Sequence, residues 1–189
     1  MVTAVSDAIP PQCSITAPAE GSYVEGTTEI TADATDNIGV ERVEFYIDGN
    51  LKSTDTTSPY SYSWDTTAES DGSHSIEAKA YDAADNVGSD SITVTVDNNP
   101  PVSFDLVSPP NGSTTSFSPL FSWSASSDAG SGLAKYQLYI DGSLNKDNIP
   151  PSSLSSKAAT PLSRGIHTWH VKAVDSLGKV TNSSSTGAI

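Results

Sequence analysis

The chain has 189 residues and a formal net charge of −14 at pH 7, from 23 acidic and nine basic residues. So acidic a surface repels phosphate backbones and anionic lipids, which argues against nucleic-acid binding and leaves cations as charged partners. No stretch approaches the roughly 18 apolar residues that a membrane span needs, so no membrane insertion is expected. The single cysteine, Cys13, excludes an intrachain disulfide and a cysteine-based metal site.

Two repeats make up the chain, and each follows a short segment that ends in Pro-Pro. These segments are DAIPP (7–11) and DNNPP (97–101). At an offset of 93 residues, VEFYIDG (43–49) aligns with YQLYIDG (136–142), and HSIEAKAYD (74–82) aligns with HTWHVKAVD (167–175). We therefore expect two domains, 8–97 and 98–189. Because proline restricts its own φ and the residue before it, the linker should be short and stiff.

The acidic residues are unevenly divided between the repeats. Residues 1–97 hold 18 acidic and three basic residues, whereas residues 98–189 hold five acidic and six basic residues.

Apolar and polar residues alternate with period two in the first repeat, which is typical of strands with one buried face. The alternating runs are 28–34, 43–47, 60–64, 74–80 and 92–96, and turn residues such as Asp48-Gly49-Asn50 and Asp71-Gly72 separate them. Cys13 alternates with Ile15 and Ala17, so we expect it to pack as a small core residue. No helical period occurs, and the pattern predicts an antiparallel sandwich.

The second repeat follows the same order. Its runs are 104–106, 121–125, 136–140 and 167–173, with Phe121, Trp123 and Ala125 assigned to one face. Trp64 and Trp123 lie on different strands, and both are expected to fill a core rather than to form a sugar platform.

Several motifs of the first repeat together carry a family resemblance. The runs SITAPAEGS, DNIGVERVEFYIDG, SPYSYSWDTT and DGSHSIEAKAYDAADN make residues 12–97 resemble the bacterial immunoglobulin-like domains of extracellular multidomain proteins. Through FSWSAS, YQLYIDG and GIHTWHVKAVDSLG, residues 98–189 resemble a diverged relative that leans toward fibronectin type III. The resemblance implies an all-β fold of two antiparallel immunoglobulin-like β-sandwiches in tandem. It also implies a secreted or cell-surface location and brings no catalytic residues.

Loop aspartates are the strongest candidates for a binding site. In an immunoglobulin-type sandwich, the loops after the second and sixth strands lie at the end where the chain enters, so their aspartates should gather there. Ca²⁺ takes six to eight oxygen ligands, and converging carboxylates would supply some of them and hold the domains in line. The alternative is that each aspartate caps its own turn through backbone N–H groups. The candidates are Asp7, Asp36 and Asp82 in the first repeat and Asp97, Asp128 and Asp175 for the second.

Outward-facing tyrosines offer a second candidate surface. Tyr46 and Tyr81 should lie on neighbouring strands, and Tyr139 matches Tyr46 in the second repeat. Stacked tyrosines could hold a sugar ring or a partner surface, although cross-strand pairing without a ligand is the commoner reason for such residues.

The three histidines do not form a catalytic or metal motif. His167 and His170 are three apart on a strand and so point to opposite faces. His74 and His167 occupy matching positions at a strand start, where a structural tie to a nearby loop is expected, and neither has a nucleophile motif beside it.

The sequence therefore predicts a non-catalytic spacer or adhesive pair within a longer secreted or surface protein. Its expected partners are neighbouring domains of the same chain, with a glycan or a surface protein as further candidates. The alternative is a carbohydrate- or protein-binding accessory of a secreted hydrolase.

Overall fold

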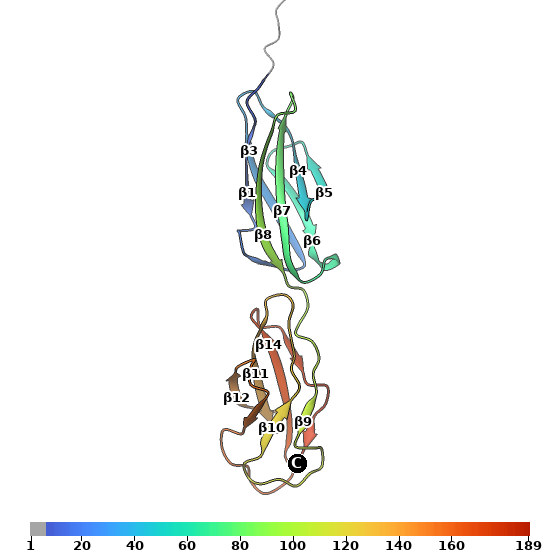
Figure 1. Ribbon diagram of the computed structural model, residues 1–189, viewed down its shortest axis with the longest axis vertical. Coiled ribbons are helices and arrows are strands. Elements are labelled where there is room, and N and C mark those ends of the chain that lie inside the picture. Colours follow the sequence, from blue (N-terminus) through green and yellow to red (C-terminus); the bar gives the residue numbers. More distant parts are fainter. Residues whose placement is uncertain (1–6) are drawn as a thin grey trace, which may run out of the picture. The chain divides into compact units, whose positions relative to one another are not determined.

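The computed structural model describes residues 7–189, which form two units, Met1–Asn98 and Asn99–Ile189 (Figure 1). Each unit is a β-sandwich. The described residues contain no helix that is long and apolar enough to cross a membrane.

Unit 1 packs a three-stranded sheet, in the order β1-β3-β6, against a five-stranded sheet, in the order β2-β8-β7-β4-β5. Its elements are β1 (Gln12–Ala17), β2 (Tyr23–Val24), β3 (Thr27–Thr35), β4 (Val40–Ile47), β5 (Asn50–Asp55), β6 (Tyr60–Asp65), the 3-10 turn η1 (Thr66–Ala68), β7 (Gly72–Asp82) and β8 (Val87–Val96). Neighbours pair antiparallel except β2, which runs parallel to β8. This parallel pair arises because the chain crosses to the other sheet after β1, where Gly21 N donates to Thr93 O at 2.7 Å.

The core of unit 1 follows the alternation in the sequence. Ile30, Phe45 and Ile76 are fully buried, and Trp64 on β6 packs in the same core. Cys13 lies at its edge as a partly buried residue, as expected. Burial of such side chains is the main stabilising contribution to a domain of this size.

A glycine lets the N-terminal segment pass close to β8. A Cβ atom at Gly88 would lie 1.8 Å from the Pro11 carbonyl oxygen, so only glycine fits without a backbone shift. This close passage leads the chain past the start of β8 just before β1 begins.

Unit 2 repeats the arrangement with shorter strands. Its sheets are β13-β10-β9 and β12-β11-β14-β15, with β16 also paired to β14. Its elements are β9 (Leu106–Ser108), β10 (Leu120–Trp123), β11 (Leu133–Ile140), β12 (Ser143–Ile149), β13 (Ser155–Lys157), β14 (Thr168–Asp175), β15 (Val180–Asn182) and β16 (Gly187–Ala188).

Residues that align at the offset of 93 form matching pairs in the two units. Ile47 pairs with Ile76 across β4 and β7, and the residues 93 positions later, Ile140 and Trp169, pair across β11 and β14.

One face assignment in unit 2 was wrong. Ala125 is exposed, because β10 ends at Trp123 and the alternation stops there. Ser126 is buried instead: its N–H donates to the Tyr136 hydroxyl at 2.7 Å, and its Oγ donates to the Val102 carbonyl at 2.6 Å. A tertiary hydrogen-bond network therefore overrides the local pattern.

Candidate cation site in the loop aspartates

Three aspartates from separate segments meet at the N-terminal end of unit 1. Asp7 precedes β1, Asp36 follows β3, and Asp82 ends β7. Each offers a carboxylate oxygen, and these oxygens lie within 4.8 Å of one another. Calcium–oxygen distances are about 2.3–2.6 Å, so two ligands on opposite sides of one ion are about 4.6–5.2 Å apart. The spacing is therefore compatible with a shared ion.

Asp36 has one satisfied oxygen and one unsatisfied oxygen. Its Oδ2 accepts from Ile38 N at 2.8 Å and Gly39 N at 3.0 Å, which is the turn-capping role. Its Oδ1 is buried without a hydrogen-bond partner among the described residues. A buried oxygen of this kind costs free energy unless something compensates its charge.

Asp82 is almost completely buried, with 1% of its surface exposed. Burial opposes its charge, but hydrogen bonds outweigh this effect and hold the pKa of Asp82 below its ordinary value. Asn86 donates through Nδ2 at 2.7 Å to Oδ2 and through its backbone N at 2.9 Å to Oδ1, and Ala84 N donates to Oδ1 at 2.8 Å. The carboxylate is thus held ionised and in one orientation.

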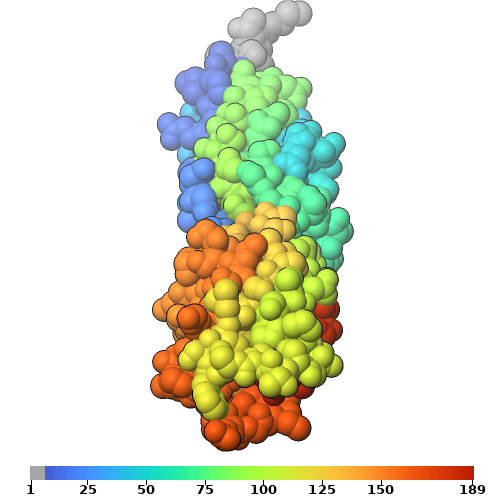
Figure 2. Space-filling view, turned by 60° about the horizontal axis from the view of Figure 1, so that its bottom comes forward, coloured from blue at the N-terminus to red at the C-terminus, as the bar shows by residue number. Residues whose placement is uncertain are grey.

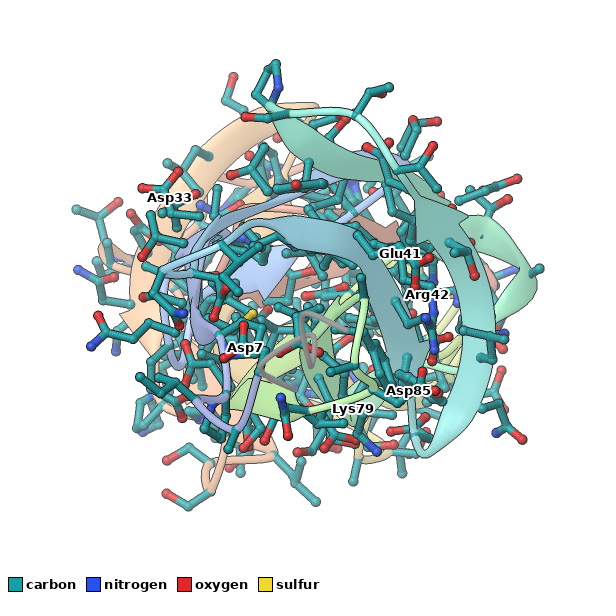
Figure 3. All side chains as sticks on the ribbon, turned by 90° about the horizontal axis from the view of Figure 1, so that it is seen from above. Asp7, Asp33, Glu41, Arg42, Lys79 and Asp85 are labelled. Carbon is teal, nitrogen blue, oxygen red and sulfur yellow. The ribbon has the colours of Figure 1, made fainter. Side chains whose placement is uncertain are left out.

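Asp7 is tied to both neighbouring loops. Its Oδ1 accepts from Asn37 Nδ2 at 3.3 Å, and its carbonyl accepts from Asn86 Nδ2 at 3.1 Å. Figure 3, which views the chain from this end, shows Asp7 apart from Arg42, whose guanidinium lies near Glu41 and Asp85. The asparagines donate hydrogen bonds to the cluster but supply no positive charge.

Unit 2 copies part of this arrangement. Asp175 is 2% exposed, and its Oδ1 accepts from Leu177 N at 2.9 Å and Lys179 N at 2.8 Å. Its Oδ2 is buried without a hydrogen-bond partner among the described residues. An oxygen of Asp128, whose Oδ2 accepts from Gly132 N at 2.7 Å, lies within 4.8 Å of one from Asp175. Asp97 belongs to unit 1, where it is fully buried, and its role beside these two residues stays a prediction.

The outward tyrosines lie as expected, but their ring faces are covered. Lys79 Nζ lies 4.6 Å from the centroid of the Tyr46 ring, and Arg42 Cζ lies 3.9 Å from that of Tyr81. The Tyr46 hydroxyl donates to Glu44 Oε2 at 2.6 Å, which raises the pKa of Tyr46. A sugar stacking on either ring would first have to displace a cation.

Tyr139 in unit 2 is covered in the same way. Its ring stacks on His170 at 4.8 Å between centroids, and Lys172 Nζ lies 4.5 Å from its centroid. Ligand binding by these tyrosines stays a prediction, and the geometry favours packing within the sheet face.

His167 lies next to an aspartate and a serine, as the histidine of a catalytic triad does, but its contacts stabilise the fold. Its Nδ1 lies 2.7 Å from Asp141 Oδ2, and its Nε2 lies 3.3 Å from both the hydroxyl and the carbonyl oxygen of Ser163.

His74, at the matching position in unit 1, also contacts an aspartate and a serine carbonyl, but no serine hydroxyl. Its Nδ1 lies 2.6 Å from Asp48 Oδ2, and its Nε2 lies 2.9 Å from the Ser70 carbonyl oxygen. The shared element is therefore a clamp between a strand start and two loops.

The geometry defines a pair of immunoglobulin-like β-sandwich modules. Residues 11–78, which lie in unit 1, match the bacterial Ig domain family. No curated protein sequence matches the chain.

The solved structures that are similar to the chain share little sequence with it. Titin domains A168–A170 have a TM-score of 0.59 at 10% identity, over 96% of this chain and 66% of that one. The fibronectin(III)-like modules of Clostridium thermocellum CbhA have a TM-score of 0.46 at 21% identity, over 94% and 91%. An endo-beta-1,4-mannanase from Thermotoga petrophila has a TM-score of 0.43 at 22% identity, over 49% of this chain and 21% of that one. The titin likeness supports the fold alone.

Proposed function

We propose that the chain is a non-catalytic spacer or adhesive segment of a longer secreted or surface protein, and that its loop aspartates bind a divalent cation. The observation that supports a cation is the meeting of three carboxylates in unit 1, one of which has a buried and unpartnered oxygen. Calcium is the expected ion because all the offered ligands are hard oxygens.

The non-catalytic role is supported by the histidine geometry. Both ring nitrogens of His74 contact oxygen acceptors, and Nε2 of His167 contacts the Ser163 carbonyl as well as its hydroxyl, so both rings tie a strand start to two loops. The matched family is a module family, and no catalytic family is indicated.

Thermal melts with and without Ca²⁺ test the cation. Extracellular calcium modules bind with dissociation constants of about 10⁻⁴–10⁻³ M, so 10 mM Ca²⁺ should stabilise the folded unit by about 1.4–2.7 kcal/mol. For a domain of this size, that corresponds to a rise of roughly 6–20 °C in melting temperature. A chelator should reverse the rise.

Two substitutions make the test specific. Asp36→Asn should abolish the calcium-dependent rise, whereas Asp33→Asn removes an exposed charge from β3 and should leave the rise intact. An unchanged melt in 10 mM Ca²⁺, or an equal loss in both variants, would show that the aspartates only cap their turns.

The second candidate is a carbohydrate-binding accessory role. It is favoured by a pocket of about 610 Å³ in unit 2, whose lining comes from two loops and residues 188–189 and includes none of these tyrosines.

A further inference from the structure

The unit 2 pocket is formed by residues 112–117, residues 162–167 and the pair 188–189. Its volume of about 610 Å³ lies within the range of about 300–1,000 Å³ that is usual for small-molecule sites. In Figure 2, the loops coloured yellow and orange lie next to each other at the end of unit 2.

Backbone hydrogen bonds hold the pocket open in one shape. Leu162 N donates to Phe117 O at 2.7 Å and so ties the two loops together. Gly112 N donates to Ala188 O at 2.7 Å, and His167 and Ile189 exchange a pair of bonds at 2.8 and 2.9 Å. A ligand would therefore enter a largely preformed site, which lowers the entropic cost of binding.

Both hydroxyl-bearing and apolar side chains line the pocket. Phe117 is 52% exposed and Ile166 is 86% exposed, so both present apolar surface to a ligand. Ser113 Oγ is buried without a hydrogen-bond partner among the described residues, and Thr115 and Ser163 also line the pocket. A sugar ring presents the complementary surface, with apolar faces and polar edges.

Charge distinguishes this loop from its copy in unit 1. At the offset of 93 residues, Leu162 and Arg164 stand where unit 1 has Glu69 and Asp71. No acidic side chain lines the pocket, and Arg164 is exposed without an ion pair among the described residues. The fork of a guanidinium matches a carboxylate with two parallel hydrogen bonds.

We propose that this pocket binds a carboxylate-bearing saccharide, with Arg164 pairing with the carboxylate and Phe117 covering one face of a sugar ring. The inference goes beyond the spacer role and gives the accessory role a site and a ligand class. It does not depend on the loop aspartates of unit 1.

Affinity electrophoresis of the 189-residue chain tests the proposal, with polygalacturonate and alginate as acidic polysaccharides and mannan as a neutral one. The wild-type chain should be retarded by at least one acidic polysaccharide and less by mannan. Arg164→Glu should weaken that binding about tenfold or more, the scale of a lost charge-assisted hydrogen bond. Phe117→Ala should also weaken it. The experiment is repeated with a chain that carries Gly-Ser after Ile189, so that a terminal carboxylate no longer follows a lining residue. This chain should bind at least as tightly as the 189-residue chain.

The matched control is Lys146→Glu, which makes the same charge change on exposed β12 of unit 2. Equal losses of polysaccharide binding in Arg164→Glu and Lys146→Glu would show that the effect comes from the overall charge of the chain, and would overturn the proposal. No retardation by either acidic polysaccharide would also overturn it. If Arg164→Glu leaves binding to mannan unchanged, the carbohydrate-binding accessory role is still supported, but this pocket is not the binding site.

Discussion

Replacing His74 with glutamine should destabilise unit 1 and remove a pH dependence of stability that we expect of the wild-type chain. The two ring nitrogens face the Asp48 carboxylate and the Ser70 carbonyl, which are both acceptors, so only the doubly protonated ring donates to both. Burial disfavours the charge, but the hydrogen bonds that the ring donates to Ser70 and Asp48 outweigh it and raise the pKa of His74 above its ordinary 6.5.

The sign of the pH dependence follows from this direction. Because the folded-state pKa of His74 is raised, its contribution to stability is fully present below about pH 6.5 and is lost as the pH rises through the raised value. The pKa of Asp48 is lowered, since hydrogen bonds from Ser75 and His74 outweigh burial. Its contribution is present above pH 3.8 and is lost as the pH falls through the lowered value. The pair therefore stabilises unit 1 most between these limits.

The magnitude follows from the contacts that His74→Gln removes. A charge-assisted hydrogen bond contributes about 1.5–3 kcal/mol, and the half-exposed Asp48 side chain places this one at the low end, about 1.5–2 kcal/mol. At pH 6 the melting temperature of unit 1 should fall by roughly 6–16 °C. The matched control, His167→Gln, removes the longer and more exposed clamp of unit 2 and should have a smaller effect.

Thermal melts from pH 5 to 9 and an NMR titration of the imidazole signals measure both effects. The wild-type chain should lose stability above pH 6.5, and His74→Gln should flatten that slope. A titration midpoint for His74 at or below 6.5, or an unchanged slope in the variant, would refute the assignment of a charged imidazole.

Two further changes probe the core and the approach of the N-terminal segment. Ile76→Ala should lower the free energy of unfolding of unit 1, measured by chemical denaturation, by about 2–5 kcal/mol because it leaves a cavity in a fully buried site. The control Ile38→Ala changes a residue that is 73% exposed, so it should change this free energy by less than about 0.5 kcal/mol. Gly88→Ala should cost about 1–3 kcal/mol, because its Cβ would overlap the Pro11 carbonyl; a variant as stable as Ser89→Ala, its exposed neighbour, would contradict this close contact.

Local alternation in the sequence was sufficient to predict most of the strands and their buried faces. Side chains on a strand point to opposite faces in turn, so Val43, Phe45 and Ile47 predict a buried face before any partner strand is known. The prediction for Ala125 was wrong because its neighbour Ser126 is held by Tyr136, a residue on another strand. The parallel pairing of β2 with β8 likewise depends on where a loop crosses between sheets.

The sequence by itself determined the two repeats, the all-β class and the loops that carry the aspartates, because these depend on residue type and spacing. The tertiary structure decided which groups come within contact distance. It brought carboxylate oxygens of Asp7, Asp36 and Asp82, which the sequence only assigned to one end of the sandwich, to within 4.8 Å of one another. It also covered the tyrosines with cations and engaged both nitrogens of His74. It also formed the unit 2 pocket from loops about 45 residues apart in the sequence. Such contacts depend on chain crossing and strand register, which no local pattern encodes.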